Sequence, residues 1–311
     1  MSDQPCIRLN ELKVAERQPI GQGGFAKVYR AWHPTHHMVA VKILNSNLDM
    51  RQFESERRIL NSAHAANACV PYYGYISENW RGLHYNGLMF KFMECGSLYE
   101  LLYRHNVYPE NCLAFRMLYD ISEGMQKLHE INRDNRVLHC DLKPGNILLD
   151  SDLHAKLCDF GGSMFATVTE CRGRVIKTDP TGTRTVHYCA PEFFQDNFRR
   201  TSKYDVYSFA IVAWGLLARS LPYVDRTVDE VKLFVTGGGR PDINSIMDNE
   251  CVKELIQRCW DQSSSARPDF REIFGTLEQP LAATEERVMA NAVQHAKEAL
   301  MRKLNTSFQR P

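Results

Sequence analysis

The segment HCDLKPGN at residues 139–146, followed by Asp159-Phe160-Gly161, is the most informative stretch of this chain. Asp141 is suited to accept the proton of an attacking hydroxyl group. Asn146 and Asp159 offer the hard oxygen ligands that Mg²⁺ prefers, and Lys143 adds a positive charge beside the transferring group. These residue types in this order predict a phosphoryl-transfer centre.

Two further informative stretches lie far upstream. Residues 20–28 read IGQGGFAKV, and residues 39–42 read VAVK. A glycine cluster alone is a weak signal, because most such clusters mark ordinary turns. In combination, these stretches resemble the phosphate-covering loop, the lysine-bearing strand, and the catalytic and Mg²⁺-binding loops of the eukaryotic protein kinases. Ala26 stands where the family pattern has its third glycine, and one added methyl group is tolerable there.

The lysine of such a site, Lys42, needs a carboxylate partner, because an unpaired ammonium group is costly to desolvate. Residues 50–60 (MRQFESERRIL) are compatible with a helix that turns one apolar side inward. The resemblance makes Glu56 on this helix the best match to the family's partner carboxylate. Glu54 is the alternative.

The protein kinase resemblance implies a cofactor and a set of site residues. It implies ATP with Mg²⁺, or Mn²⁺, in the crevice between two lobes that meet at residues 91–96. The residues implied to act in catalysis are Asp141, Lys143, Lys42 and Glu56. Those implied to contact the nucleotide are Gly21, Gln22, Gly23, Gly24, Phe25, Ala26, Val28, Ala40, Lys42, Phe90, Phe92, Met93, Asn146, Leu148 and Asp159. Those implied to hold the metal are Asn146 and Asp159.

Three more motifs are typical of protein kinases. They are APE at residues 190–192, DVYSF at residues 205–209 and RPDF at residues 267–270. The resemblance implies that Glu192 and Arg267 form a buried ion pair and that Asp205 holds the catalytic loop through its backbone. These residues are therefore expected to be structural.

The resemblance covers residues from about 14 to 275 and is most specific for one group of kinases. Lys143, two residues after Asp141, is typical of serine/threonine kinases. The DVYSF and RPDF motifs resemble the tyrosine-kinase-like group, and residues 149–157 together with a helix after Pro280 resemble the receptor-interacting protein (RIP) kinases. Those kinases usually carry C-terminal homotypic interaction segments, and none is visible here, which leaves open that the chain is part of a longer protein.

The RIP-like resemblance implies a functional setting. It implies a cytoplasmic serine/threonine protein kinase that transfers the γ-phosphate of ATP to protein substrates in receptor-proximal innate immune, inflammatory or cell-death signalling. The implied partners are a second copy of the chain, forming a homodimer, or an upstream adaptor or receptor.

Composition narrows the class of protein. The chain has 311 residues, of which 44% are hydrophobic, so it can bury a substantial core. A formal net charge of +1 gives no reason to expect a nucleic acid or an anionic membrane as partner. The longest apolar stretch, residues 209–218, is too short for insertion in a membrane and predicts a core helix. The ten cysteines include no C-x-x-C pair and are interpreted as reduced thiols of a cytosolic protein.

The pattern along the chain predicts an α+β, bilobal fold. Residues 14–93 alternate short apolar runs with turn residues around one helix, which indicates a small antiparallel β lobe. Residues 94–283 show three- and four-residue apolar spacing, which indicates a large helical lobe. Residues 1–13 are polar and are expected to be flexible, and residues 306–311 are expected to form a tail.

Residues 284–305 predict an additional C-terminal helix. Its apolar residues recur at four-residue spacing, with acidic residues at the start and basic residues near the end, as the helix dipole favours. Such an apolar stripe must be buried either on the large lobe or on a second chain. We favour docking on the large lobe.

Cys140 departs from the family pattern, in which arginine stands between the histidine and the aspartate. In most kinases, that arginine binds the phosphate group added to the activation segment, which here is residues 165–188. Six threonines of this segment carry candidate phosphorylation sites: Thr167, Thr169, Thr178, Thr181, Thr183 and Thr185. Because the arginine is absent, we expect activity to depend less on loop phosphorylation and more on dimerisation.

Two other functions remain open on the sequence. The first is a nucleotide-binding pseudokinase or scaffold that signals by conformational switching and oligomerisation. The retained Lys42, Asp141 and Asp159 argue against it. The second is a small-molecule phosphotransferase of related fold, which would lack the protein-substrate docking segment that the APE motif and Arg267 indicate.

Overall fold

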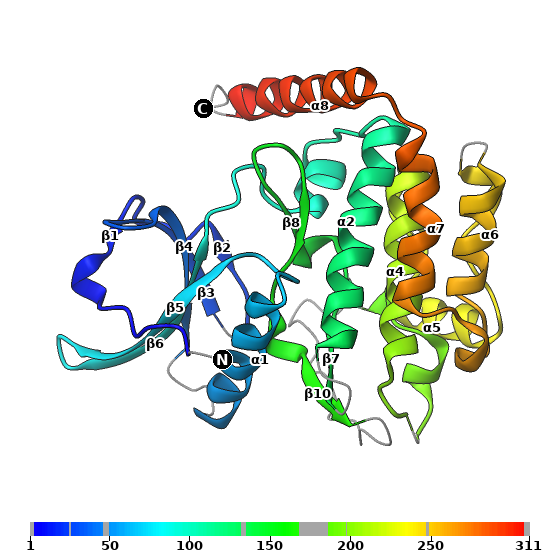
Figure 1. Cartoon of the computed structure of the whole chain (residues 1–311). Coiled ribbons are helices and arrows are strands. Elements are labelled where there is room, and N and C mark those ends of the chain that lie inside the picture. Colours follow the sequence, from blue (N-terminus) through cyan, green and yellow to red (C-terminus); the bar gives the residue numbers. More distant parts are fainter. Residues whose placement is uncertain are drawn as a thin grey trace.

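The computed structural model describes residues 3–24, 26–45, 50–131, 135–167, 186–196, 198–246 and 249–307. One lobe is built around an antiparallel sheet and the other is mostly helical (Figure 1). The α+β, bilobal fold expected from the sequence is therefore confirmed. Phe25 and the activation-segment residues 168–185 lie outside the described residues.

The first lobe contains a six-stranded sheet in the order β1-β3-β4-β6-β5, with β2 paired to β3. All of its pairings are antiparallel. Along β4, the buried Val39 and Val41 alternate with the half-buried Ala40 and Lys42, so one face of the sheet is fully covered and the other remains partly accessible. The strands are β1 (Lys13–Val14), β2 (Gly21–Gln22), β3 (Ala26–His33), β4 (His37–Leu44), β5 (Tyr72–Trp80) and β6 (Leu83–Lys91).

Helix α1 (Met50–Ala65) is the one long helix among the described residues of the strand lobe. It buries Phe53, Ile59 and Leu60, which recur at helical spacing on one side. At its C-terminal end, His64 Nδ1 accepts a hydrogen bond of 3.2 Å from the backbone N–H of Tyr72 at the start of β5. The helix is therefore attached to the sheet at that end.

The helical lobe is organised around α4, which is buried along almost its whole length. It contains most of the apolar stretch that the sequence predicts to be a core helix. No helix among the described residues has the length and apolarity to cross a membrane. The helices of this lobe are α2 (Asn111–Glu130), α4 (Ser202–Leu217), α5 (Val228–Thr236), α6 (Glu250–Cys259), α7 (Phe270–Ala282) and α8 (Glu286–Ser307).

Short elements between α2 and α4 carry the segment from which the sequence analysis begins. The β8 and β9 strands pair with each other, and β10 pairs with β7. The bounds of these strands and turns are β7 (Asn135–Leu138), η3 (Pro144–Asn146), β8 (Ile147–Leu149), β9 (Ala155–Leu157), η4 (Phe160–Gly162), β10 (Met164–Thr167) and η5 (Pro191–Phe194). Two further turns lie beyond α4: η6 (Ile243–Ser245) after α5, and η7 (Ser264–Ala266) after α6. A π-helical turn, η2 (Glu100–Arg104), follows the connection between the lobes.

The N-terminal residues differ from the expectation of a flexible segment. Residues 3–12 pack on the strand lobe, and Ile7 is only 5% exposed. The segment includes the short turn η1 (Leu9–Glu11). The prediction was wrong because three apolar residues, Ile7, Leu9 and Leu12, are interspersed among the polar ones and supply a buried side.

The C-terminal helix α8 lies across the helical lobe and contacts α2 (Figure 1). Ala292, Ala296 and Leu300 are buried and belong to the main hydrophobic core cluster, as the intramolecular alternative requires. His295 also lies 3.0 Å from Glu110, at the start of α2.

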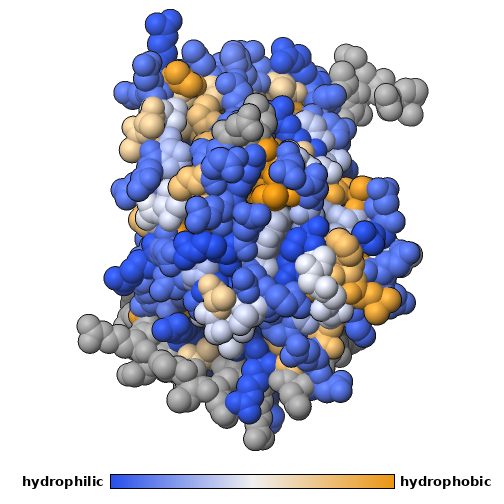
Figure 2. Space-filling view, turned by 90° about the vertical axis from the view of Figure 1, so that its right-hand side faces the viewer, coloured by the Kyte–Doolittle hydropathy of each residue, from blue (hydrophilic) through white to orange (hydrophobic). Residues whose placement is uncertain are grey.

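The surface beside these helices is mostly polar. Figure 2 shows one face of the helical lobe, with mainly hydrophilic residues and small, separated apolar patches. Val224 and Leu233 are two large apolar side chains of this lobe that remain mostly exposed. Single exposed apolar residues of this kind are normal on a protein surface.

Candidate active site

Three residues of the HCDLKPGN segment meet around one carboxylate. Lys143 Nζ lies 2.8 Å from Asp141 Oδ2. The Asn146 side-chain amide donates to Asp141 Oδ2 at 3.0 Å and to the Asp141 backbone oxygen at 2.8 Å. The short turn η3 brings Asn146 back towards Asp141, with Pro144 at a position where its missing N–H costs nothing. The cluster therefore comes from one local turn.

Asp205 of α4 holds this turn from beneath. It is completely buried, and its two carboxylate oxygens accept the backbone N–H groups of His139 at 2.9 Å and Cys140 at 2.8 Å. His129 of α2 lies 2.9 Å from the same carboxylate. A buried charge needs such partners to offset its desolvation. The expected backbone contact of Asp205 is present.

Lys42 of β4 connects the two lobes of the site. Its ammonium group donates to Glu56 Oε1 at 2.8 Å and to Asp159 Oδ1 at 2.8 Å. Glu56 lies on the buried side of α1, whereas Glu54 pairs with Arg57 on the same helix. The structure thus brings Glu56, and not Glu54, to the lysine.

The charged groups of the site shift one another's pKa values. Burial opposes the charge of Lys42, but the carboxylates of Asp159 and Glu56 outweigh it and raise the pKa of the lysine. In return, the Lys42 ammonium group lowers the pKa of Asp159 to about 2, against the partial desolvation of this carboxylate in the cleft. Burial raises the pKa of Asp141, and the nearby Lys143 ammonium group opposes this rise. Asp159 is therefore the more firmly ionised of the two aspartates.

The strand register places several predicted nucleotide contacts on one face of the sheet. Val28 lies opposite Lys42, and Ala40 lies opposite Phe90. Directly opposed residues of an antiparallel pair share a face, as do residues two apart along a strand. These four side chains therefore line the face that also packs against α1. Tyr72 supports Phe90 from β5, at 5.5 Å between ring centroids.

The glycine-rich stretch forms the β2–β3 connection. Gly21 and Gln22 form β2, and the backbone N–H of Gly23 donates to the Ala26 oxygen at 2.9 Å. The backbone oxygen of Gly24 accepts from the Asn45 amide at 2.9 Å. A Cβ atom added at Gly23 would have no neighbouring atom within 4 Å. The loop is therefore not packed against the sheet at this residue.

The remaining predicted contacts lie where the lobes join. Phe92 and Met93 follow β6, and Met93 is buried. Leu148 lies in β8, opposite Lys156 of β9, and forms an isolated bridge with Ser97 just beyond the connection. Leu148 is thus held against the segment that links the two lobes.

Asp159 and Asn146 fit the requirements of Mg²⁺. The ion commonly takes one or two protein oxygen ligands together with substrate phosphates and water. The Asp159 side chain is 48% exposed, so it can still be reached from the cleft. Because the Asn146 amide nitrogen is directed to Asp141, its oxygen is the atom left to serve as a ligand. These residues could hold the metal, which would neutralise phosphate charge during transfer.

Cys140 occupies a buried position beneath the turn. It is 1% exposed and packs with Leu138, Ala166 and Met164. Its φ of 64° is in the left-handed region, which is uncommon for a residue with a side chain. The six candidate threonines of the activation segment lie outside the described residues, apart from the backbone of Thr167.

The expected ion pair of the helical lobe is formed. Arg267 is 1% exposed and binds Glu192 through two bonds, Nη1–Oε1 at 2.7 Å and Nη2–Oε2 at 2.8 Å. Its Nε also donates to the backbone oxygen of Asp261 at 2.9 Å. This paired geometry satisfies a charge that would be costly to bury alone.

Sequence reasoning missed two features of the structure. His129 contacts Asp205 from 76 positions earlier in the chain, and no local pattern marks it. The packed residues 3–12 were also missed, although the alternating Ile7 and Leu9 are a short strand-like signal.

Comparison with known protein families finds one that matches most of the chain. Residues 14–277 match the family described as "Protein tyrosine and serine/threonine kinase". This range includes every residue proposed above for the site.

Among similar proteins is receptor-interacting serine/threonine-protein kinase 2 of Bos taurus, 32% identical over 314 aligned positions. These cover 94% of this chain and 57% of the relative. Receptor-interacting serine/threonine-protein kinase 3 of Homo sapiens is 34% identical over 322 positions, covering 99% of this chain and 59% of the relative. Human ankyrin repeat and protein kinase domain-containing protein 1 is 36% identical over 220 positions, covering 67% of this chain and 28% of the relative. The chain thus spans little more than half the length of the first two relatives.

Proposed function

This chain belongs to the protein tyrosine and serine/threonine kinase family, and from that membership we propose that it is a serine/threonine protein kinase that transfers the γ-phosphate of ATP to hydroxyl groups of protein substrates. The observation that carries the proposal is the Lys42 ammonium group, which lies 2.8 Å from both Glu56 and Asp159. Three charged groups from separate parts of the chain converge there, in the arrangement that phosphate binding requires.

Each residue has a role in the proposed reaction. Lys42, fixed by Glu56, would hold the phosphates of ATP. Asp159 and Asn146 would hold Mg²⁺. Asp141 would accept the proton of the substrate hydroxyl, and Lys143 would stabilise negative charge on the transferring group.

The charges at the site support two of these proposed roles. Asp159 keeps its negative charge because Lys42 lowers its pKa, which suits a metal ligand. Asp141 is less readily ionised because burial raises its pKa, and this makes it a better proton acceptor than an exposed aspartate. The two aspartates therefore suit different tasks.

The choice of serine and threonine rests on Lys143 and on the relatives' names. Both receptor-interacting relatives are named serine/threonine-protein kinases. Their names also support a role in receptor-proximal signalling, which the resemblance places in innate immune, inflammatory or cell-death responses in the cytoplasm. A homodimer or an upstream adaptor or receptor would then control the kinase.

The test is transfer of radiolabelled phosphate from ATP to a generic protein substrate. We expect phosphate on serine and threonine, and a loss of roughly 10²- to 10⁴-fold in the Asp141→Asn variant, the usual contribution of a general base. Asp225→Asn, an exposed aspartate of the helical lobe, is the matched control and should retain full activity. ATP binding with no transfer above the Asp141→Asn level would favour the pseudokinase alternative.

A further inference from the structure

Residues 3–12, which we call the N-terminal strap, extend the strand lobe beyond its edge strand β5. Cys6 forms a parallel bridge with Tyr75. The Ile7 N–H donates to the Tyr75 oxygen at 2.7 Å, and the Tyr75 N–H donates to the Pro5 oxygen at 3.1 Å. These bonds satisfy the backbone of an edge strand that would otherwise be open.

The edge strand is shaped to receive the strap. The β5–β6 register shifts between Tyr72 and Gly74, and Gly74 has a φ of +154°. A Cβ atom at Gly74 would lie 2.4 Å from the Pro5 oxygen, far below a van der Waals contact. Only glycine allows the two backbones to approach this closely.

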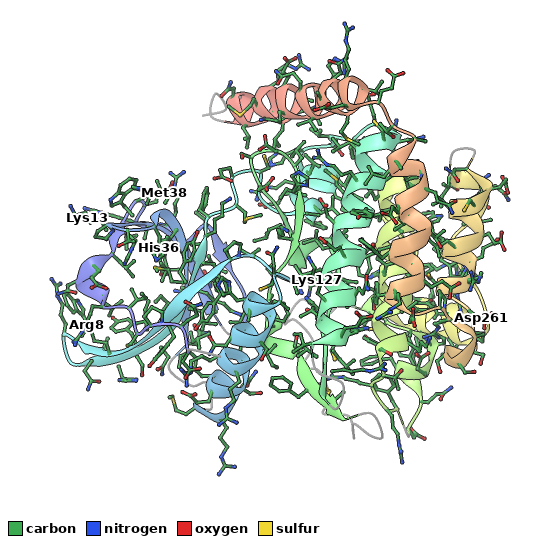
Figure 3. All side chains as sticks on the ribbon, viewed as in Figure 1. Arg8, Lys13, His36, Met38, Lys127 and Asp261 are labelled. Atoms are coloured by element: carbon green, nitrogen blue, oxygen red, sulfur yellow. The ribbon has the colours of Figure 1, made fainter. Side chains whose placement is uncertain are left out.

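The strap then crosses the sheet face opposite to the one that carries Lys42. Ile7, Leu9 and Leu12 pack with Val39 and Val41, the residues of β4 that alternate with Ala40 and Lys42. Figure 3 labels Arg8 of the strap and Lys13 of β1, which follows it, on the side of the strand lobe away from the helical lobe. The strap is therefore remote from the proposed nucleotide face.

The start of the strap is bonded to α1. The Asn61 side-chain amide donates to Asp3 Oδ1 at 2.8 Å, and Asn61 Oδ1 accepts the Gln4 N–H at 3.4 Å. Arg57 Nη1 lies 3.4 Å from Asp3 Oδ2, and its guanidinium group lies 4.6 Å from the centre of the Tyr75 ring. The strap, α1 and β5 thus share one set of contacts, beside the N-terminus in Figure 1.

We propose that the N-terminal strap positions the active site: by tying α1 to the edge of the sheet, Asp3 and Asn61 keep Glu56 within reach of Lys42. Arg57 follows Glu56 directly in the helix, so a movement of α1 at the strap also moves the carboxylate. The Lys42–Glu56 bond is 2.8 Å long, and a shift of about 1 Å takes it beyond hydrogen-bond range. The consequence for catalysis rests on the proposed kinase function. Asp3 and Asn61 are positioning residues, because they touch neither nucleotide nor substrate.

A reciprocal exchange in the full chain tests the pair. Asn61→Asp sets two carboxylates against each other and should release the strap from α1. Adding Asp3→Asn to that variant restores an amide–carboxylate pair, in which position 3 now carries the amide and position 61 the carboxylate. Ser62→Ala is the matched control, because Ser62 lies in the same turn and, among the described residues, its hydroxyl bonds only to the backbone oxygen of Arg58 in its own helix.

Two measurements decide the outcome. We expect Asn61→Asp to speed hydrogen exchange of the α1 amides and to lower kcat/KM by about fivefold, the effect of one lost hydrogen bond. The double variant should recover both, and Ser62→Ala should change neither. Recovery on exchange of partners is specific to the strap contact and would not follow from a general loss of stability.

The proposal is overturned if α1 exchange does not change, or if it changes while kcat/KM stays constant. Equal losses in Ser62→Ala would also overturn it, because the effect would then belong to the helix and not to the strap. If the unmodified chain transfers no phosphate, the proposed function fails, and the dissociation constant for Mg·ATP replaces kcat/KM. A dissociation constant that rises in Asn61→Asp and recovers in the double variant then supports the strap proposal. A constant that does not change in Asn61→Asp overturns it.

Discussion

Asp141 and Asp159 show how the surroundings shift the pKa of one residue type in opposite directions. The Lys42 ammonium group lowers the pKa of Asp159 to about 2, so its carboxylate stays ionised near neutral pH. Burial raises the pKa of Asp141, and Lys143 limits the rise. Two titratable groups whose pKa values are displaced in opposite directions are typical of an assigned metal ligand and an assigned base.

The first prediction concerns the pH dependence of kcat/KM. Asp141 must be ionised to accept a proton, so activity should fall as the pH falls through its raised pKa. This decline should lie above the pH of about 3.9 at which an ordinary aspartate titrates. Lys143→Met removes the charge that opposes the rise, so the midpoint of the acidic limb should move to higher pH.

The measurement is kcat/KM against pH, with each profile scaled to its own maximum. Lys127→Met is the control, because Lys127 pairs with Glu123 of the same helix, α2. An acidic limb that stays in place, or moves to lower pH, in Lys143→Met would show that Asp141 is not the group being titrated.

At the scale of elements, periodicity predicted the helix near the C-terminus but could not select its partner. The same four-residue spacing serves for docking on this chain or on another one. The structure buries Ala292, Ala296 and Leu300 against the helical lobe, while Val288 stays 45% exposed. All three belong to the main hydrophobic core cluster, and α8 contacts α2.

The second prediction compares two adjacent residues of α8. Leu300 is 4% exposed and Met301 is 56% exposed. Leu300→Ala should lower the free energy of unfolding by about 2 to 3 kcal/mol, the lower part of the range for buried leucines, because α8 lies at the edge of the core. Met301→Ala should change it by less than about 0.5 kcal/mol.

Urea unfolding followed by circular dichroism measures both variants, with light scattering to record their mass. Equal stability of the two variants would mean that α8 is not packed on the lobe in solution. A stable Leu300→Ala variant with half the mass of the unmodified chain would instead place the helix at an interface between two copies.

At the scale of the whole molecule, the sequence was sufficient where contacts are local. The turn that joins Asp141 to Asn146 spans six residues, so the motif itself predicts the contact. Lys42 and Asp159 are 117 positions apart, and only the family resemblance connected them. Periodicity could not choose Glu56 over Glu54, because that choice depends on how α1 is rotated against the sheet.

The strap shows the opposite limit. Its contacts depend on a glycine in β5 and on the outer face of α1, neither of which is near it in sequence. A short polar segment with a few apolar residues looks like a tail until the surface that receives it is known. The fold class could thus be predicted from the sequence, whereas the element that borders α1 could not.

The last prediction concerns ligand-linked stability of the two-lobed molecule. A ligand that binds only the folded state stabilises it by RT ln(1 + [L]/Kd), or about 2.7 kcal/mol at 100 times Kd. Mg·ATP should therefore raise the melting temperature of the chain by several degrees. Asp159→Asn should remove the part of this rise that depends on Mg²⁺, because the amide is a weaker ligand and no longer pairs as strongly with Lys42.

The comparison must be between shifts and not between absolute melting temperatures, because Asp159→Asn also alters the ion pair in the free protein. Each variant is melted with ATP and Mg²⁺ and with ATP and a chelator, and Asp225→Asn again serves as the exposed control. A full Mg²⁺-dependent shift in Asp159→Asn would exclude Asp159 as a metal ligand. A shift in the unmodified chain without any phosphate transfer would leave the nucleotide site intact and make the molecule a binding switch instead of an enzyme.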